Sequence, residues 1–168
     1  MNKLLSINTN RWVKKNNVVR STTEYGQTQT IGILFCVEDK AKHEVIKAFI
    51  HRLENDNKKI EVLVYLPEKK ENYDFLFDYF TKKDISFWGK YNSPKVLEFS
   101  SKSFDYLLHL DFDSQQITNG ILALSKAKCR IGGANVEQNK FYEMIITTPT
   151  KNIKQLVDEM YKYISILN

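Results

Sequence analysis

The sequence predicts an α/β fold, a three-layer Rossmann-like sandwich with a mostly parallel sheet and a basic N-terminal arm. Three observations predict it. Short β-branched and aromatic runs recur between residues 30 and 148, as expected for strands that are buried on both faces. Amphipathic stretches separate most of these runs and supply the crossovers that parallel strands need. Most of the excess positive charge lies ahead of the first strand.

The first half of the predicted domain alternates strands with helices. A near-continuous apolar run at residues 30–37 predicts a central strand. Apolar residues spaced by three and four predict a helix at residues 40–55, with Asp39 as its cap. A second buried strand at residues 60–67 ends at a proline. A helix, a short strand and a turn or single helical turn are then expected at residues 71–83, 84–89 and 93–101.

The second half continues the alternation. A buried strand is predicted at residues 104–110, and a helix at residues 115–125 follows an acidic turn. Two short strands at residues 128–133 and 141–148 come next. A helix with one apolar stripe closes the chain at residues 151–167.

The net charge of +5 is divided unevenly along the chain. Residues 1–30 carry +4 and residues 31–168 carry only +1. We therefore divide the chain into a basic arm at 1–29 and a single α/β domain at 30–168. Such an arm can meet phosphate, an acidic membrane surface or an acidic protein patch. The candidate binding residues of the arm are Arg11, Trp12, Lys14, Lys15 and Arg20.

Several classes of chemistry lack their motifs. No GxGxxG or P-loop sequence is present, and the two acids at 38–39 would repel phosphate. No Ser-His-Asp set, HExxH or CxxC occurs. We therefore expect no catalytic residues, no cofactor and no metal. Two cysteines within apolar runs indicate buried thiols in a reducing compartment. Since no secretory signal or membrane span is visible, we expect a cytoplasmic protein.

Polar residues and glycines lie at the predicted carboxyl ends of strands, where α/β folds bind ligands. Asp111 and Asp113 could hold Mg²⁺, but we favour helix capping by Asp113 or Ser114. Gly132 and Gly133 permit a close ligand approach, although a tight turn is the commoner reason for two glycines.

An aromatic patch lies between two predicted elements. Trp88 and Tyr91 could stack on a base while Lys90 meets phosphate. Packing of a short strand against the helix layer would explain these aromatic residues equally well.

The order of several motifs resembles an uncharacterised family of small α/β proteins from Bacteroidota, a domain of unknown function. The matching pieces are IGILFCVED, SFWGKYNS, KSFDYLLHL, ALSKAKCRIGG and FYEMIITT, within roughly residues 30–168. A more distant similarity is to the N-terminal Rossmann-like half of heptosyltransferase-like glycosyltransferases. It rests on Phe104-Asp105 and on the strand end Arg130-Ile131-Gly132. The first resemblance implies no activity, and the second implies a fold that handles sugar nucleotides.

We predict a non-enzymatic binding module that docks through arm 1–29 onto a larger macromolecular partner. That partner would be the ribosome, another RNA assembly or an acidic protein surface, with no DNA sequence readout. The alternative is a small-molecule or sugar-nucleotide binding domain that uses Asp111, Asp113, Gly132 and Gly133. A third interpretation is an oligomer whose arm covers the sheet edge of a neighbour, and the oligomeric state stays open.

Overall fold

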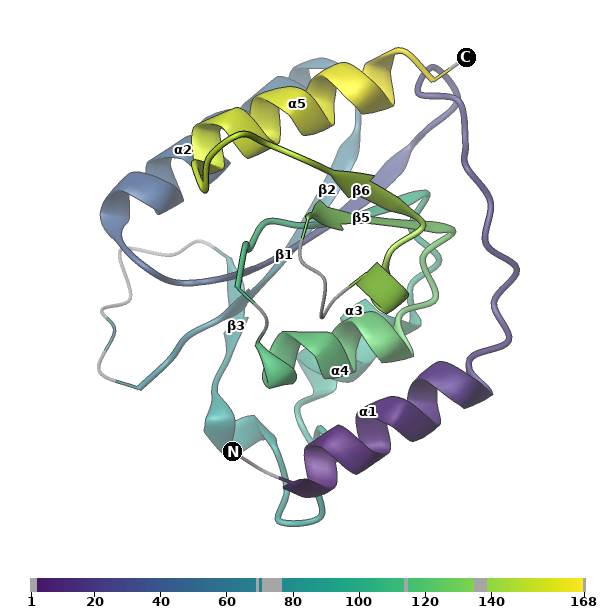
Figure 1. Cartoon of the computed structure of the whole chain (residues 1–168), viewed down its shortest axis with the longest axis vertical. Helices are drawn as coiled ribbons and strands as arrows, with labels where there is room; N and C mark the ends of the chain where they lie inside the picture. Colours follow the sequence, from purple (N-terminus) through teal and green to yellow (C-terminus); the bar gives the residue numbers. More distant parts are fainter. Residues whose placement is uncertain (1–2, 69, 71–76, 114, 135–138, 168) are drawn as a thin grey trace.

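The computed structural model describes residues 3–68, 70, 77–113, 115–134 and 139–167 (Figure 1). Its centre is a six-stranded sheet in the order β3-β2-β1-β4-β5-β6, and every neighbouring pair is parallel. The strands are β1 (Thr30–Cys36), β2 (Lys59–Tyr65), β3 (Asp78–Phe80), β4 (Tyr106–His109), β5 (Cys129–Gly133) and β6 (Met144–Ile146). This strand order is that of a Rossmann-like doubly wound sheet. The predicted fold class is confirmed.

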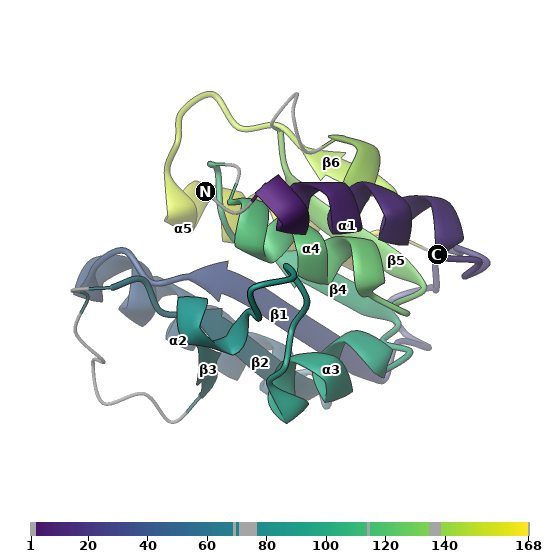
Figure 2. The same ribbon diagram turned by 90° about the horizontal axis from the view of Figure 1, so that it is seen from below.

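Helices cover both faces of the sheet (Figures 1 and 2). One face carries α2 (Lys40–Asn55) and α5 (Ile153–Ser165), and the other carries α3 (Pro94–Ser101) and α4 (Gln116–Leu124). The N-terminal helix α1 (Lys3–Lys15) lies along α4 on the second face. Each face has its own apolar core, because β1 and β4 point fully buried side chains to both sides.

The segment between β2 and α3 departs from the sequence prediction. A helix was expected at residues 71–83, but Asp78–Phe80 forms strand β3 beside β2, and residues 71–76 lie outside the described residues. The strand expected at residues 84–89 is wrong: a short 3-10 helix, Lys82–Asp84, leads into a turn. Residues 94–101 form the full helix α3 rather than a single turn. Short apolar runs fit both the helical and the strand period, so periodicity could not decide here.

The order of the strands reverses between β1 and β4. In folds of this kind the crevice outside the carboxyl ends of these two strands is the usual place for a ligand. Here β1 leads into Glu38 and Asp39, and β4 leads into Asp111 and Asp113. Asp39 caps α2 as predicted, since its side chain accepts a hydrogen bond from the backbone N–H of Lys42 at 2.7 Å.

Candidate functional site

The predicted basic arm folds against the domain. Leu5 of α1 is 2% exposed and belongs to the apolar core that α4 and Tyr91 share. Thr9 is also buried, and its hydroxyl donates to the Leu5 carbonyl at 2.8 Å. The ring of Trp12 lies 5.8 Å from that of Tyr91 and is only partly exposed. Trp12 therefore anchors α1 to the body. The opposite side of α1 is left open.

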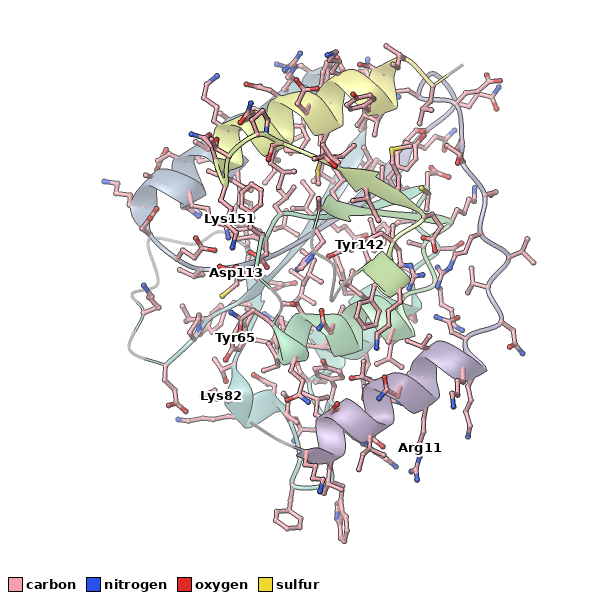
Figure 3. The ribbon with its side chains drawn as sticks, in the orientation of Figure 1. Arg11, Tyr65, Lys82, Asp113, Tyr142 and Lys151 are labelled. Atoms are coloured by element: carbon pink, nitrogen blue, oxygen red, sulfur yellow. The ribbon has the colours of Figure 1, made fainter. Side chains whose placement is uncertain are left out.

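The open side of α1 is basic. Lys3, Arg11, Lys14 and Lys15 are exposed, and Figure 3 shows Arg11 on the outer side of the helix. Within the described residues, none of these four cations forms an ion pair. No Asp or Glu occurs before Glu24 in the sequence, so α1 itself offers no carboxylate.

Two lysines of the body extend this basic surface. Lys126 donates to the side chain of Asn16 at 3.0 Å, and Lys140 donates to the side chain of Asn10 at 3.2 Å. Both therefore sit beside α1 and bond to amides instead of carboxylates. The six residues of this surface, called the α1 face below, are Lys3, Arg11, Lys14, Lys15, Lys126 and Lys140.

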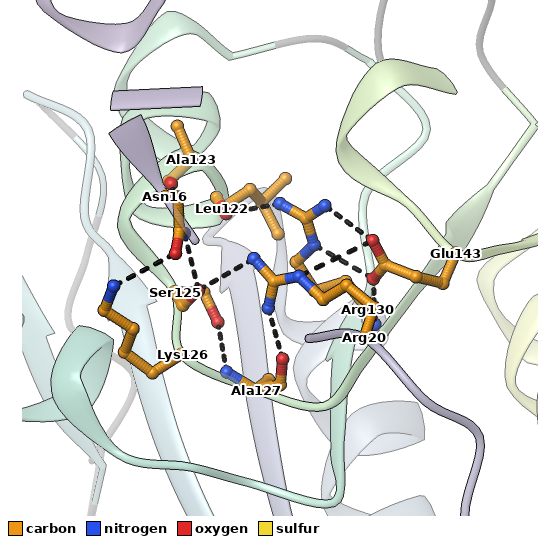
Figure 4. Close-up of polar contacts among 9 residues, drawn as sticks. All are labelled: Asn16, Arg20, Leu122, Ala123, Ser125, Lys126, Ala127, Arg130 and Glu143. Atoms are coloured by element: carbon orange, nitrogen blue, oxygen red, sulfur yellow. Dashed lines mark hydrogen bonds and ion pairs between the residues drawn. The ribbon is translucent and has the colours of Figure 1, made fainter. Parts of the chain in front are cut away.

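Arg20 does not belong to the α1 face. Its guanidinium donates to the carbonyls of Ala127 and Ser125 and lies 3.8 Å from Glu143 (Figure 4). Burial and the neighbouring Arg130 hold the pKa of Arg20 below its ordinary value. Its charge is thus used internally, so the structure gives no support to Arg20 as a contact for a partner.

Arg130 completes that internal cluster. It donates to both carboxylate oxygens of Glu143, at 2.6 and 3.0 Å, and to the Leu122 carbonyl at 2.8 Å (Figure 4). The side chain of Arg130 is almost buried, and a fork-like pair of this kind fixes geometry more than an exposed lysine pair does. The cluster ties the segment after α1 to β5.

The aromatic patch is built differently from the prediction. Tyr91 is buried and donates its hydroxyl to the Ile117 carbonyl, so it faces the core and not a ligand. Trp88 is 69% exposed, and its neighbour Phe87, which the sequence analysis left out, is 81% exposed. The two rings contact edge to face at 5.5 Å. Lys90 is exposed beside them.

The turn that carries these rings is fixed to the start of α1. The Asn8 side-chain amide donates to the carbonyls of Trp88 and Gly89, at 2.8 and 2.9 Å. Gly89 has φ +68, and a Cβ there would overlap the backbone of Leu4 and Leu5. Only glycine fits this close approach. We call Phe87 and Trp88 the aromatic turn; it projects next to the α1 face.

The strand-end residue Asp111 lies inside the protein. Its carboxylate accepts from the backbone N–H of Cys36 and from Lys42 Nζ, at 3.0 and 2.6 Å. Lys42 also reaches Glu38 at 2.6 Å. Burial by itself would raise the pKa of Asp111, but Lys42 and His109 hold it below the ordinary value. Burial opposes the charge of Lys42 too, yet Asp111 and Glu38 raise the pKa of that ammonium.

His109 and Tyr142 continue the same network. His109 Nε2 lies 3.0 Å from Asp111, and its Nδ1 lies 2.7 Å from the Tyr142 hydroxyl. Figure 3 places Tyr142 between the sheet and α4. A Cβ on Gly132 would overlap the Tyr142 ring, which explains the glycine without a ligand. A Cβ on Gly133 would lie at ordinary contact distance from Leu156, so packing does not require glycine there.

The composition of this network resembles that of a proton relay, but its side chains are not exposed as those of a relay are. An ammonium, a carboxylate, an imidazole and a phenol lie in series, and such groups transfer protons in many enzymes. All four side chains are nearly or fully buried, and they point at one another. The arrangement therefore joins the start of α2 to the ends of β1 and β4 and to Tyr142.

Asp113 does not cap α4. It lies 2.5 Å from Lys151, and no side chain within the described residues caps that helix; Ser114, the other predicted cap, lies outside them. Figure 3 shows Asp113 and Lys151 near each other above the sheet. Within the described residues, no group of three or more acids, histidines or cysteines could hold a metal ion.

Sequence reasoning missed Lys42 and Tyr142, and it assigned no role to Phe87. Lys42 lies 69 residues before Asp111, so only the fold brings the two together. Tyr142 follows a short 3-10 helix, Asn139–Phe141, and no spacing marks it as a partner of His109. Phe87 was visible in the sequence next to Trp88, and two adjacent large aromatic residues beside a glycine were the available signal.

The comparisons with known proteins agree with this picture of an uncharacterised domain. The profile of a family of unknown function matches residues 2–167. The chain belongs to the DUF6913 family. The match includes α1 as well as the sheet, so the basic helix is part of what DUF6913 describes. No curated protein and no solved structure matches the chain. Within the described residues of this DUF6913 protein, no helix is long and apolar enough to cross a membrane.

Proposed function

We propose that the protein is a non-enzymatic binding module that docks its α1 face onto RNA within a larger assembly such as the ribosome. The observation that carries the proposal is a group of cations without carboxylate partners gathered on one helix. Several cations of the body do pair with carboxylates, as Lys128 does with Asp105 at 2.8 Å and Lys102 does with Glu61 at 2.6 Å. Among the described residues, the four cations of α1 form no such pair. Unpaired cations on a rigid helix are available for phosphate.

The aromatic turn supports RNA over an acidic protein surface. The Asn8 side chain of α1 bonds to the backbone of the turn that carries Phe87 and Trp88, and both rings are exposed. Exposed aromatic rings beside cations are the combination that binds single-stranded nucleic acid, because bases stack on the rings while phosphates meet the cations. An acidic peptide would need the cations but not two exposed aromatic rings.

Charge substitution tests the proposal better than deletion of the arm. Removing residues 1–29 would also remove Leu5 from the core, so lost binding would have two explanations. Glutamine at the four α1 positions keeps helix propensity and removes only charge. The test variant is K3Q/R11Q/K14Q/K15Q. A control with the same charge loss lies on α2 and α5, across the sheet, and all four of its lysines are exposed: K40Q/K47Q/K154Q/K162Q.

Co-sedimentation with ribosomes and titration of unstructured RNA give the readout at two salt concentrations. Counterion release predicts a slope of log affinity against log salt of about −0.7 per phosphate contacted on a single strand. We expect the α1 variant to lose at least about tenfold in affinity and to flatten this slope by about 3, while the control stays within about twofold. An equal loss of affinity in both variants would contradict the RNA proposal. So would an α1 variant that loses affinity for polyglutamate but not for RNA.

The aromatic turn can be tested separately. The double variant F87A/W88A should weaken binding of unstructured RNA by about 1–3 kcal/mol for each stacked base. The salt slope should not change, because no phosphate contact is removed. A variant that binds as well as the wild type would restrict the interface to α1.

The sugar-nucleotide alternative has less support. Asp111 is bonded to Lys42 inside the protein, and Gly132 faces the Tyr142 ring, so neither residue is open to a ligand. A thermal-shift panel of nucleotide sugars, with and without Mg²⁺, tests it, since a bound ligand stabilises the folded state. An RNA partner would also imply the cytoplasmic location that we expect from the sequence.

A further inference from the structure

A cavity of about 470 Å³ opens beside the carboxyl ends of the strands, on the face of the sheet that carries α1 and α4. It is separate from the buried network around Asp111. Its lining comes from α1, the end of β2, the segment around the short helix at residues 82–84 and the first turn of α4. A volume of this size is in the range that small-molecule sites occupy. Its lining residues are Leu5, Tyr65, Lys82, Ile85, Gln115, Gln116 and Ile117.

We propose that this cavity binds a small organic anion, a molecule with an apolar body and one carboxylate or phosphate group. The proposal does not depend on RNA binding by the α1 face. The apolar body would contact Leu5, Ile85 and Ile117, which form the apolar part of the wall. Carboxamides of Gln115 and Gln116 offer both donors and acceptors at the start of α4.

Tyr65 is the first observation that points to a ligand. The residue as a whole is 4% exposed, and it lines the cavity. Burial raises the pKa of this phenol, so at neutral pH the hydroxyl carries its proton and can donate. A hydroxyl at a cavity wall can bond to water or to a polar group of a ligand. Tyr65 lies at the cavity wall, where a ligand atom would reach it.

Lys82 is the second observation. Among the described residues that line the cavity, Lys82 is the one charged side chain, and none of them carries a carboxylate. Figure 3 shows Lys82 and Tyr65 close together next to the beginning of α4. The nearby Asp84 is engaged elsewhere, since its carboxylate accepts from the backbone N–H and the hydroxyl of Thr81. An anion therefore meets a cation at the cavity without a competing acid.

The choice of an anion is tested with matched probes that share one aromatic skeleton. Naphthylacetate, naphthylethanol and naphthylethylamine carry a negative, a neutral and a positive head group, and inorganic phosphate serves as a probe without an apolar body. Amide and methyl NMR signals of the lining residues are followed during titration of the full-length protein. We expect naphthylacetate to shift the Ile85 and Ile117 signals saturably, and to do so at a lower concentration than any of the other probes. Equal affinity for the amine, or phosphate binding as tightly as naphthylacetate, would overturn the proposal.

The variant Lys82→Gln tests the cation, and Lys83→Gln is its matched control. Both lysines are exposed and adjacent, but only Lys82 lines the cavity. A hydrogen bond to a charged group is worth enough that K82Q should raise the Kd for naphthylacetate by about tenfold or more. K83Q should leave it within about twofold. Equal effects of the two substitutions would show a general charge effect and overturn the proposal.

Two further variants address the site directly. Tyr65→Phe removes only the hydroxyl and should raise the Kd by about fivefold, as expected for one neutral hydrogen bond. Gln116→Trp should fill the cavity and abolish the shifts, with folding checked by circular dichroism. If naphthylacetate binds Q116W as well as it binds the wild type, it binds elsewhere and the proposal fails. Unchanged RNA binding by all these variants would show that the two proposals stand separately.

Discussion

The ammonium of Lys42 lies 2.6 Å from the carboxylate of Asp111, and both side chains are almost completely buried. Asp111 also accepts two contacts from the backbone N–H of Cys36. The pair thus joins the start of α2 to the ends of β1 and β4, at the point where the strand order reverses. In many Rossmann-like proteins a ligand occupies that crevice; here the protein fills the innermost part with its own charges.

Replacing Asp111 by asparagine should lower the free energy of unfolding by about 3–5 kcal/mol, because it leaves Lys42 buried without its main partner. Asp113→Asn is the control. Asp113 pairs with Lys151 at the surface, and such pairs contribute about 0–1 kcal/mol. Urea denaturation at neutral pH measures both. Similar effects of the two substitutions would contradict a structural role for the buried pair.

The same pair predicts a pH dependence. The pKa of Asp111 in the folded protein lies below its unfolded value of 3.8. Its stabilising contribution is therefore complete above the unfolded pKa and is lost as the pH falls through the folded pKa. The difference in unfolding free energy between wild type and Asp111→Asn should stay constant from about pH 7 to about pH 5 and narrow below about pH 4. A difference that widens in acid would mean that Asp111 is protonated in the folded protein, and a difference that does not change would mean that its pKa is the same in the folded and unfolded states.

The contact between Gly132 and Tyr142 predicts a non-additive pair of substitutions. Gly132→Ala places a methyl group against the buried ring and should cost about 1–3 kcal/mol by overpacking. In a Tyr142→Ala background the ring is absent, so the added methyl should cost almost nothing. A double-mutant cycle from urea denaturation measures the coupling. Full additivity would show that the ring moves away freely.

The regular part of the fold could be predicted from the sequence because its patterns are local. The buried run at β1 and the apolar stripe of α2 each specify one element, and their alternation specifies a parallel sheet. Whether the arm forms helix α1 or lies extended could not be decided from the sequence, since only a few of its residues are apolar and its stability depends on contacts such as Trp12 with Tyr91. Helix formation there is a tertiary effect.

For the candidate sites, too, some features could be predicted from the sequence and others could not. The exposed cations of α1 were predictable, because charge and the absence of acids are visible in the sequence. The roles of Arg20 and Asp111 were not, because Glu143 and Lys42 reach them only through the fold. The cavity beside Tyr65 likewise brings together residues from α1, β2 and α4, and no spacing along the chain marks it.

Leu5→Ala tests whether α1 is part of the folded domain. Leu5 is buried against α4, so the truncation should lower the free energy of unfolding by about 2–4 kcal/mol. Ile7→Ala, on the exposed side of the same helix, should change it by less than about 1 kcal/mol. Guanidinium denaturation measures both. Equal and small effects would mean that α1 detaches from α4 in solution.

The two cysteines should be unreactive in the folded protein. Burial, with Asp111 nearby, raises the pKa of Cys36 to about 12, and burial, with Glu143 nearby, raises the pKa of Cys129 to about 11. Since the thiolate is the reactive form, a thiol reagent at about pH 8 should modify neither residue in the native protein and both in urea. The native rate should follow the equilibrium for opening as urea is added, because each thiol must be exposed before it reacts. Modification of either cysteine at the rate of an unfolded peptide would show that the strand carrying it, β1 or β5, is accessible from solution.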